Sequence, residues 1–273
     1  MSLRLSPTFR DRLAAADRPL AGLWACAGSS VATEIIAGSG IDWLLIDMEH
    51  SPNGLSSVLA QLQVVAAYPV TPVVRVPIGD VVTIKQVLDL GAQNILVPMV
   101  STAAEARAAV SAVRYPPRGT RGVGSALARS ARWNRVEGYL DNADEHTSLF
   151  VQIETVEGVA AAAEIAAVDG IDGVFVGPSD LAASMGLLGQ QTHPDVTAAV
   201  RSVFEAARTA GTPVGVNAFD PSVARAYADA GAGFLLVGAD VSLLARESER
   251  LAAQWSPTTG AGDRRGHGDR PSY

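Results

Sequence analysis

The sequence contains almost no lysine and almost no cysteine. Lys85 is the only lysine among 21 basic residues, and Cys26 is the only cysteine in 273 residues. An aldolase that works through a Schiff base needs a lysine amine, but Lys85 falls within the helix-like run 81–90, away from any predicted strand end. A single cysteine excludes an internal disulfide bond and a cysteine-cluster metal site. Both kinds of chemistry are therefore disfavoured.

Long apolar runs and basic stretches are also absent. No uninterrupted apolar run approaches the roughly 20 residues of a membrane span, and segment 1–19 has no apolar signal core. The formal net charge of -7 disfavours non-specific binding to nucleic acid. We therefore expect a soluble cytoplasmic protein that binds neither a membrane nor nucleic acid.

The sequence does contain a regular alternation of short β-branched runs with alanine-rich amphipathic stretches. Eight such units predict a single α/β domain, a (β/α)₈ TIM barrel over residues 1–255. An open doubly wound sheet is the main alternative, but no GxGxxG motif follows the first strand. The predicted strands are Leu20–Ala25, Trp43–Asp47, Val73–Arg75, Ile95–Pro98, Leu149–Glu154, Gly173–Val176, Pro213–Val216 and Phe234–Gly238. The predicted helices are Ala32–Ala37, Leu55–Ala67, Val81–Leu90, Ala103–Val113, Val156–Ile165, Pro194–Ala210, Ser222–Ala230 and Val241–Gln254.

Two segments depart from this alternation. Residues 114–148, which we call the excursion, are too many for an ordinary helix-to-strand connection, and they begin with the arginine-rich motif RYPPRGTRGVG. Long ordered loops in barrels are commonly functional, but a surface or subunit contact is equally compatible with this segment. Residues 256–273 are polar and glycine-rich, which predicts a flexible tail.

Polar residues at strand ends are the first candidates for a site, because barrel enzymes carry their active sites at the carboxyl ends of the strands. Glu154 and Asp180 follow two neighbouring predicted strands. A strand spacing of about 4.8 Å allows both carboxylates to share one cation, and Mg²⁺ or Mn²⁺ favours such oxygen ligands. The alternative is structural, with Glu154 as an acid at a helix start and Asp180 as a helix N-cap.

A histidine and an arginine lie at the ends of two other predicted strands. His50 suits a general base whose ring Asp47 orients; a loop histidine satisfied by its own turn is the alternative. Arg75 lies in an apolar strand, where a guanidinium group needs an anion. That anion is a structural acid such as Asp47 or Glu49 or, as we favour, the substrate. Trp24 fits core packing and an aromatic wall of the site equally well.

These parts together suit enolate chemistry. A divalent metal ion polarises the carbonyl group of a bound 2-oxo acid and lowers the barrier to deprotonation at C3. An arginine stabilises the negative charge that develops on the enolate oxygen. A barrel without an available lysine is thus predicted to run this chemistry through a metal ion.

Long motifs in the chain resemble the HpcH/HpaI family, which are metal-dependent class II pyruvate aldolases. The resemblance implies reversible retro-aldol cleavage of a 4-hydroxy-2-oxo acid to pyruvate and an aldehyde, through an enolate stabilised by Mg²⁺ or Mn²⁺, with Co²⁺ as a further possibility. The motifs are LLIDMEHSPN (44–53), KQVLDLGAQNILVPMV (85–100), RYPPRGTRGVG (114–124), VQIETVEG (151–158) and GIDGVFVGPSDLAASMG (170–186).

The resemblance also implies roles for single residues. Glu154 and Asp180 would be the metal ligands. His50 would be the base, acting through a water molecule, with Asp47 as its partner. Arg75 would hold the keto oxygen of the substrate.

Further roles concern the edge of the site and a neighbouring subunit. Gln152 would lie beside the bound pyruvate, and Ser179, where relatives often have alanine, would shape the mouth of the site. Asp89 would act from an adjacent subunit of a homo-oligomer, a trimer or a hexamer, with a terminal helix packed on a neighbour. We further hypothesise that Arg118 and Arg121 recognise the distal carboxylate of an acidic aldehyde.

Two other functions stay open at this point. One is a related lyase that acts on an acyl-CoA thioester, and the other is a non-catalytic barrel that serves as a binding module. The identity of the aldehyde, the physiological metal and the pathway do not follow from the sequence.

Overall fold

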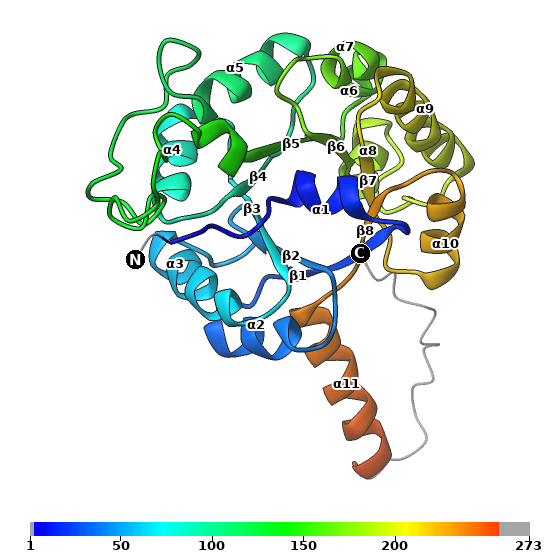
Figure 1. The fold of residues 1–273 in the computed structure, drawn as a ribbon. Coiled ribbons are helices and arrows are strands. Elements are labelled where there is room, and N and C mark those ends of the chain that lie inside the picture. Colours follow the sequence, from blue (N-terminus) through cyan, green and yellow to red (C-terminus); the bar gives the residue numbers. More distant parts are fainter. Residues whose placement is uncertain (1–2, 257–273) are drawn as a thin grey trace.

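Eight short runs of β-branched and apolar residues form eight parallel strands, which close into a barrel in the order β1 to β8 (Figure 1). The structure is a computed structural model, and it describes residues 3–256. The predicted (β/α)₈ barrel is confirmed. The strands are β1 (Leu20–Ala25), β2 (Trp43–Asp47), β3 (Thr71–Arg75), β4 (Asn94–Val97), β5 (Ser148–Ile153), β6 (Gly173–Val176), β7 (Val214–Asn217) and β8 (Phe234–Ala239).

Helices surround the barrel on its outer side (Figure 1). No helix among residues 3–256 is long and apolar enough to cross a membrane. The α-helices are α1 (Phe9–Ala15), α2 (Ser30–Ala37), α3 (Leu55–Val64), α4 (Val81–Asp89), α5 (Ala103–Val113), α6 (Val156–Ala160), α7 (Ala162–Ala166), α8 (Pro178–Ser184), α9 (Pro194–Ala210), α10 (Pro221–Asp229) and α11 (Asp240–Trp255). Two 3₁₀ helices, η1 (Val65–Ala67) and η2 (Ala143–His146), complete the described elements.

The predicted strands differ from the observed ones only at their ends, by two residues or fewer, but the helix prediction needs correction. The prediction omitted α1 and α8, and the helix expected over Val156–Ile165 is divided at Ala161. Both omitted helices have seven residues, too short for a periodic apolar pattern to be recognised. Local capping nevertheless supports them: Thr8 forms a capping box with Asp11 at the start of α1, and Pro178 occupies the first turn of α8.

Aromatic side chains fill the barrel interior at the amino-terminal end of the strands. Phe9 of α1 closes this end, with its ring centroid 4.9 Å from Trp43, 5.2 Å from Phe150 and 5.4 Å from Phe234. A Cβ atom at Gly215 would lie 2.3 Å from the Phe234 ring, so the glycine makes room for the aromatic ring. Because aromatic rings fill the barrel interior at this end, the opposite end, where the strands finish, is the expected place for an active site.

The excursion runs from α5 to β5, which places it at the amino-terminal end of the strands. It packs around its own small core of Ala131, Val136, Tyr139 and Ala143. Within one subunit, its arginines therefore lie at the end of the barrel opposite the strand-end candidates. Binding of the substrate's distal carboxylate by Arg118 and Arg121 would therefore require another subunit, and this hypothesis stays a prediction. The tail predicted at 256–273 lies, apart from Ser256, outside the described residues.

Candidate active site

The ends of β2 and β3 bring Arg75 against two acids. Asp47 and Arg75 are register partners in the sheet, and Arg75 Nε donates to Asp47 Oδ1 at 2.7 Å. Arg75 Nη1 lies 2.9 Å from Glu49 Oε2, an ion pair without hydrogen-bond alignment. The guanidinium carbon lies 4.3 Å from the centroid of the Trp24 ring. Arg75 is only 4% exposed, so its buried charge is compensated by structural acids, the alternative that the sequence left open.

The two acids beside Arg75 differ in electrostatic environment. Burial acts to raise the pKa of Asp47, but the hydrogen bond and charge of Arg75 outweigh it and hold this pKa below its ordinary value. Burial raises the pKa of Glu49, and the charge of Arg75 only partly opposes that rise. Asp47 is therefore a fixed anion that orients Arg75, whereas Glu49 is the acid of the pair that is easier to protonate.

Glu154, just past β5, is held by two donors in a buried position. Its Oε1 accepts a hydrogen bond from Met99 N at 2.8 Å, and its Oε2 accepts one from Gln152 Nε2. A Cβ atom at Gly177 would lie 2.7 Å from Glu154 Oε2, so a glycine is needed beside the carboxylate. Glu154 is 2% exposed, and burial raises its pKa to about 7, with further repulsion from Asp180 and Glu49.

Asp180 lies in the first turn of α8, exposed to solvent. Its charge raises the pKa of both Glu154 and Glu49, so the three carboxylates share one region at the strand ends. Such mutual repulsion is relieved when a cation binds between acids. Asp180 is thus brought to Glu154 as predicted from the strand order.

These residues fit a hard divalent cation. Glu154 and Asp180 offer carboxylate oxygens, and Gln152 Oε1 is a buried acceptor without a hydrogen-bond partner. Among residues 3–256, no group of three or more histidine, cysteine, aspartate or glutamate side chains is arranged to hold a metal ion. An ion here would therefore have few protein ligands, as is common for Mg²⁺, with water and substrate completing its coordination.

His50 follows β2 and projects from the rim with 65% of its side chain exposed. Its Nε2 lies 3.9 Å from Glu49 Oε2. Asp47 instead accepts hydrogen bonds from the backbone amide of His50 at 3.1 Å and from Ser51 Oγ at 2.9 Å. Asp47 therefore fixes the turn that carries His50, and the expectation that it orients the imidazole ring needs correction, since Glu49 is the nearer acid.

Two other predicted residues lie at the same end of the barrel. Trp24 is largely buried at the end of β1, and its Nε1 donates to Asn217 Oδ1 at 2.8 Å. With Arg75 over its ring, Trp24 acts both as core and as the wall beneath the guanidinium group. Ser179 is half-buried in the first turn of α8, next to Asp180.

Asp89 lies apart from this group within one subunit. It is the last residue of α4, at the amino-terminal end of the barrel, beside the excursion. Burial raises its pKa, and the charges of Arg121 and Lys85 oppose that rise. Arg121 is 1% exposed, and its Nη2 donates to Tyr139 Oη at 3.0 Å. A role for Asp89 at the strand ends would require another subunit.

Sequence reasoning missed Met99 and Gly177. Met99 has a backbone φ of 57°, an uncommon conformation for a residue other than glycine, and it presents its N–H to Glu154. No sequence pattern marks this conformation. Gly177, by contrast, directly follows a predicted strand and precedes Asp180 by three residues. Its closeness to the two acids could therefore have been predicted from the sequence.

A closed parallel barrel with acids, an arginine and a histidine gathered at its strand ends defines the chain as a (β/α)₈-barrel enzyme. The model of the HpcH/HpaI aldolase/citrate lyase family matches residues 20–246. The chain therefore belongs to this family.

Individual relatives differ in their named activities. The 4-hydroxy-2-oxo-heptane-1,7-dioate aldolase of Salmonella dublin is 51% identical over 247 residues, which cover 90% of this chain and 94% of that protein. An HpcH/HpaI aldolase/citrate lyase family protein from Burkholderia cenocepacia J2315 has a TM-score of 0.86 and 42% identity, covering 90% of this chain and 97% of that chain. The citrate synthase SbnG has a TM-score of 0.81 at 27% identity, with coverage of 90% and 96%.

Proposed function

We propose that the chain is a class II pyruvate aldolase that cleaves 4-hydroxy-2-oxo acids, including 4-hydroxy-2-oxo-heptane-1,7-dioate, to pyruvate and an aldehyde. The observation that carries this proposal is the gathering of Glu154, Asp180 and Arg75 at the strand ends. The aldolase that is 51% identical over nearly the whole chain supports the choice of substrate.

Glu154 and Asp180 would hold a divalent cation, Mg²⁺ or Mn²⁺, which when bound supplies Lewis-acid polarisation of the keto group of the substrate. Arg75 places its positive charge where the enolate oxygen develops. Its Nη2 makes no hydrogen bond with any residue of 3–256, and this atom is not fully buried. This nitrogen is therefore available to a substrate oxygen, while Asp47 and Glu49 hold the rest of the guanidinium group.

His50 is the proposed base. Directly or through water, it removes the proton from the C4 hydroxyl group of the substrate, the C3–C4 bond breaks, and the electron pair of that bond becomes the enolate of pyruvate. The aldehyde leaves, and a proton added at C3 gives pyruvate. Exposure of the His50 ring suits this role, because the base must reach both substrate and solvent.

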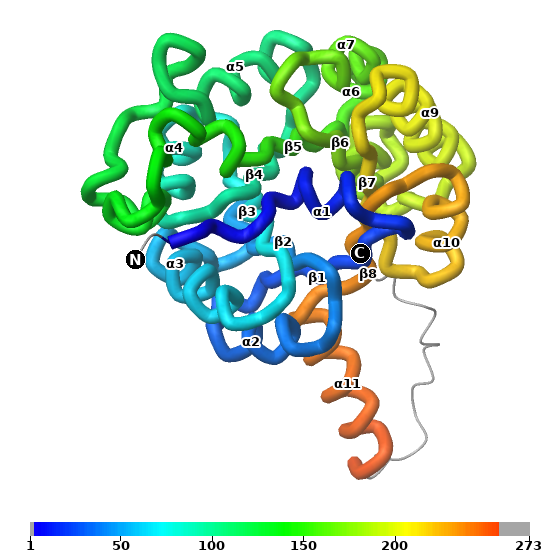
Figure 2. Tube along the Cα trace, viewed as in Figure 1, coloured from blue at the N-terminus to red at the C-terminus, as the bar shows by residue number. Residues whose placement is uncertain are grey.

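We further propose that the enzyme acts as a homo-oligomer, a trimer or a hexamer. Helix α11 projects away from the barrel (Figures 1 and 2). It exposes Leu243, Leu244 and Trp255, and the neighbouring α2 exposes Val31 and Ile35. Apolar surface of this extent is typical of an interface, and an oligomer is also what a catalytic contribution from Asp89 requires. The subunit number is measured by light scattering.

The function is tested by pyruvate release from 4-hydroxy-2-oxo-heptane-1,7-dioate. We expect release to stop after exhaustive chelation and to return when Mg²⁺ or Mn²⁺ is added. Undiminished activity in the chelated protein would rule out the metal-dependent mechanism. The same preparation is assayed with an acyl-CoA substrate such as citramalyl-CoA, because the family description includes citrate lyases. Inactivity with both substrates would favour a non-catalytic barrel.

A His50→Ala variant separates proton transfer from binding. We expect the exchange of pyruvate C3 protons with solvent deuterium to slow by about 10²–10⁴-fold, the usual contribution of a general base, while metal affinity stays unchanged. Exchange is followed by NMR. The control is His193→Ala, because His193 only caps α9. Equal exchange rates in the His50 and His193 variants would rule out His50 as the base.

A further inference from the structure

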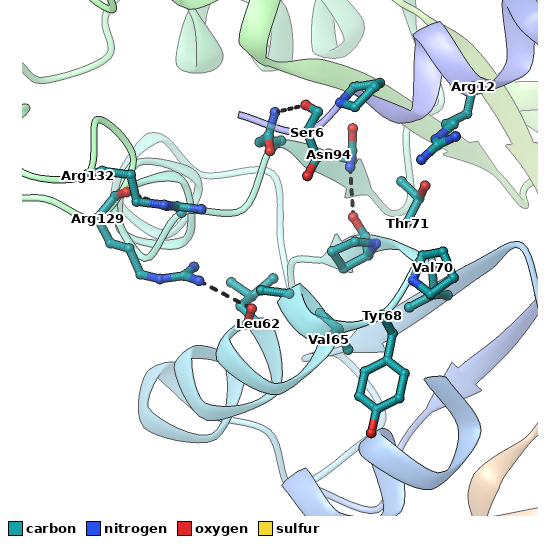
Figure 3. Close-up of a pocket in the computed structure, with 16 residues that line it drawn as sticks. Ser6, Arg12, Leu62, Val65, Tyr68, Val70, Thr71, Asn94, Arg129 and Arg132 are labelled. Carbon is teal, nitrogen blue, oxygen red and sulfur yellow. Dashed lines mark hydrogen bonds between the residues drawn. The ribbon is translucent and has the colours of Figure 1, made fainter. Parts of the chain in front are cut away.

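A cavity at the amino-terminal end of the barrel gathers three arginines and no acid. It lies between the N-terminal segment, the end of α3 and the excursion, and its lining includes Arg12, Arg129 and Arg132 but no aspartate or glutamate (Figure 3). Its volume of about 90 Å³ is several times the roughly 10–15 Å³ that one water molecule needs. A polyatomic ion therefore fits inside it.

The two arginines of the excursion lack a countercharge. Arg129 donates from Nη1 to Leu90 O at 3.0 Å and from Nη2 to Leu62 O at 3.3 Å. Arg132 donates from Nη1 to Arg129 O. These acceptors are neutral carbonyl groups, and within the described part of the chain neither arginine forms an ion pair. Both side chains are half-buried, and removing a charge even partly from water is unfavourable unless an opposite charge compensates it. The cavity therefore favours an anion.

The pKa values of Arg129 and Arg132 reflect this lack of a countercharge. Burial, together with the nearby charge of Arg132, lowers the pKa of Arg129 to about 10. Burial also lowers the pKa of Arg132. The two guanidinium groups both lie beside Gly91. A Cβ atom at Gly91 would be 2.7 Å from Arg129 Nη1 and 2.9 Å from Arg132 Nη1. Two cations held this close favour an anion between or beside them.

A third arginine faces them across the cavity. Arg12, on α1, approaches from the side opposite Arg132, with Thr71 and Asn94 between them (Figure 3). The side chain of Arg12 is exposed and forms no ion pair or hydrogen bond with any residue of 3–256. The cavity thus collects donors from α1 and from the excursion, two segments far apart in the sequence.

We propose that this cavity binds a small oxyanion with two negative charges, held by Arg12, Arg129 and Arg132. Planar guanidinium groups pair well with phosphate-like and carboxylate oxygens. The bound anion would join α1 to the excursion and compensate the half-buried arginines Arg129 and Arg132. The site is separate from the strand ends, where acids predominate, and the proposal does not depend on the catalytic function.

Inorganic phosphate is the probe for this site. It is titrated into the full-length protein with Mg²⁺ present, at constant ionic strength kept with NaCl, and the melting temperature and binding isotherm are recorded. We expect saturable binding that raises the melting temperature. Affinity should fall at least about tenfold in Arg132→Gln and in Arg12→Gln, since each removes a charge-assisted hydrogen bond to the anion. The exposed Arg107→Gln on α5 loses the same charge elsewhere and should bind as the parent does.

Two results would overturn the proposal. One is a phosphate response that is absent in the parent protein or identical in the parent, Arg12→Gln and Arg107→Gln, because binding would then not involve this cavity. The other is a response that disappears in Glu154→Gln, because it would then belong to the strand-end site. Crystals soaked with selenate provide the direct observation, with an anomalous peak expected between Arg12 and Arg132. Succinate in place of phosphate distinguishes a dicarboxylate site from a tetrahedral oxyanion site.

Discussion

Glu154→Gln should lower kcat for 4-hydroxy-2-oxo acid cleavage by about 10³-fold or more. Glu154 supplies a buried carboxylate to the proposed cation, and glutamine keeps the shape while removing the charge. Loss of Lewis-acid stabilisation is worth several kcal/mol, and about 4 kcal/mol corresponds to a factor of 10³ in rate. The expected accompanying loss of Mn²⁺ affinity is measured by calorimetry.

The melting temperature of Glu154→Gln shows whether its loss of activity comes from misfolding. Burial raises the pKa of Glu154 to about 7, so the ionised carboxylate is unfavourable in the metal-free protein. The metal-free glutamine variant should therefore melt at the same temperature as the parent or higher. The matched control is Glu157→Gln, an exposed glutamate in the first turn of α6, which should retain full activity. Normal metal affinity and activity in Glu154→Gln would contradict the assignment of Glu154 as a metal ligand.

Arg75→Ala should be both inactive and strongly destabilised. Asp47 is 1% exposed, and it would lose the countercharge that lies 2.7 Å away. Removing one partner of a buried ion pair typically costs about 3–5 kcal/mol. Denaturant-induced unfolding measures the free energy of unfolding. The control is Arg246→Ala, which breaks an exposed pair with Glu249 and should cost less than about 1 kcal/mol.

A second substitution distinguishes the structural role of Arg75 from its chemical role. Replacing Asp47 by asparagine in the Arg75→Ala background removes the uncompensated charge, and we expect about 1–3 kcal/mol of stability to return. Activity should stay lost, because no cation remains beside the enolate oxygen. Recovery of activity together with stability would mean that Arg75 only organises the fold.

Much of the fold could be predicted because strand and helix periods are local properties. The runs at β1, β2 and β6 agree with the predicted bounds, since short apolar runs between turn residues mark strands directly. Helices α1 and α8 could not be predicted from periodicity, because seven residues complete only two turns. Their capping residues were the available signal.

The sequence predicted which residues belong to the candidate site better than it predicted the contacts between them. The strand order brings Glu154 and Asp180 to one end of the barrel, and the structure keeps them there. The partner of the His50 ring was predicted incorrectly, because the choice between Asp47 and Glu49 depends on how the turn after β2 folds back. Whether Asp89 joins the site, and what the tail does, stay predictions.

The sequence by itself predicted the barrel and the end of the barrel at which the acids meet, and its single lysine disfavoured Schiff-base chemistry. These follow from composition and from the rule that parallel strands end on one side. Only the tertiary structure decided that Arg75 is bound by Asp47 and Glu49, that Met99 and Gly177 shape the surroundings of Glu154, and that the excursion turns its arginines away from the site. Such contacts join residues distant in sequence, and their energies depend on burial and distance, which no local pattern records.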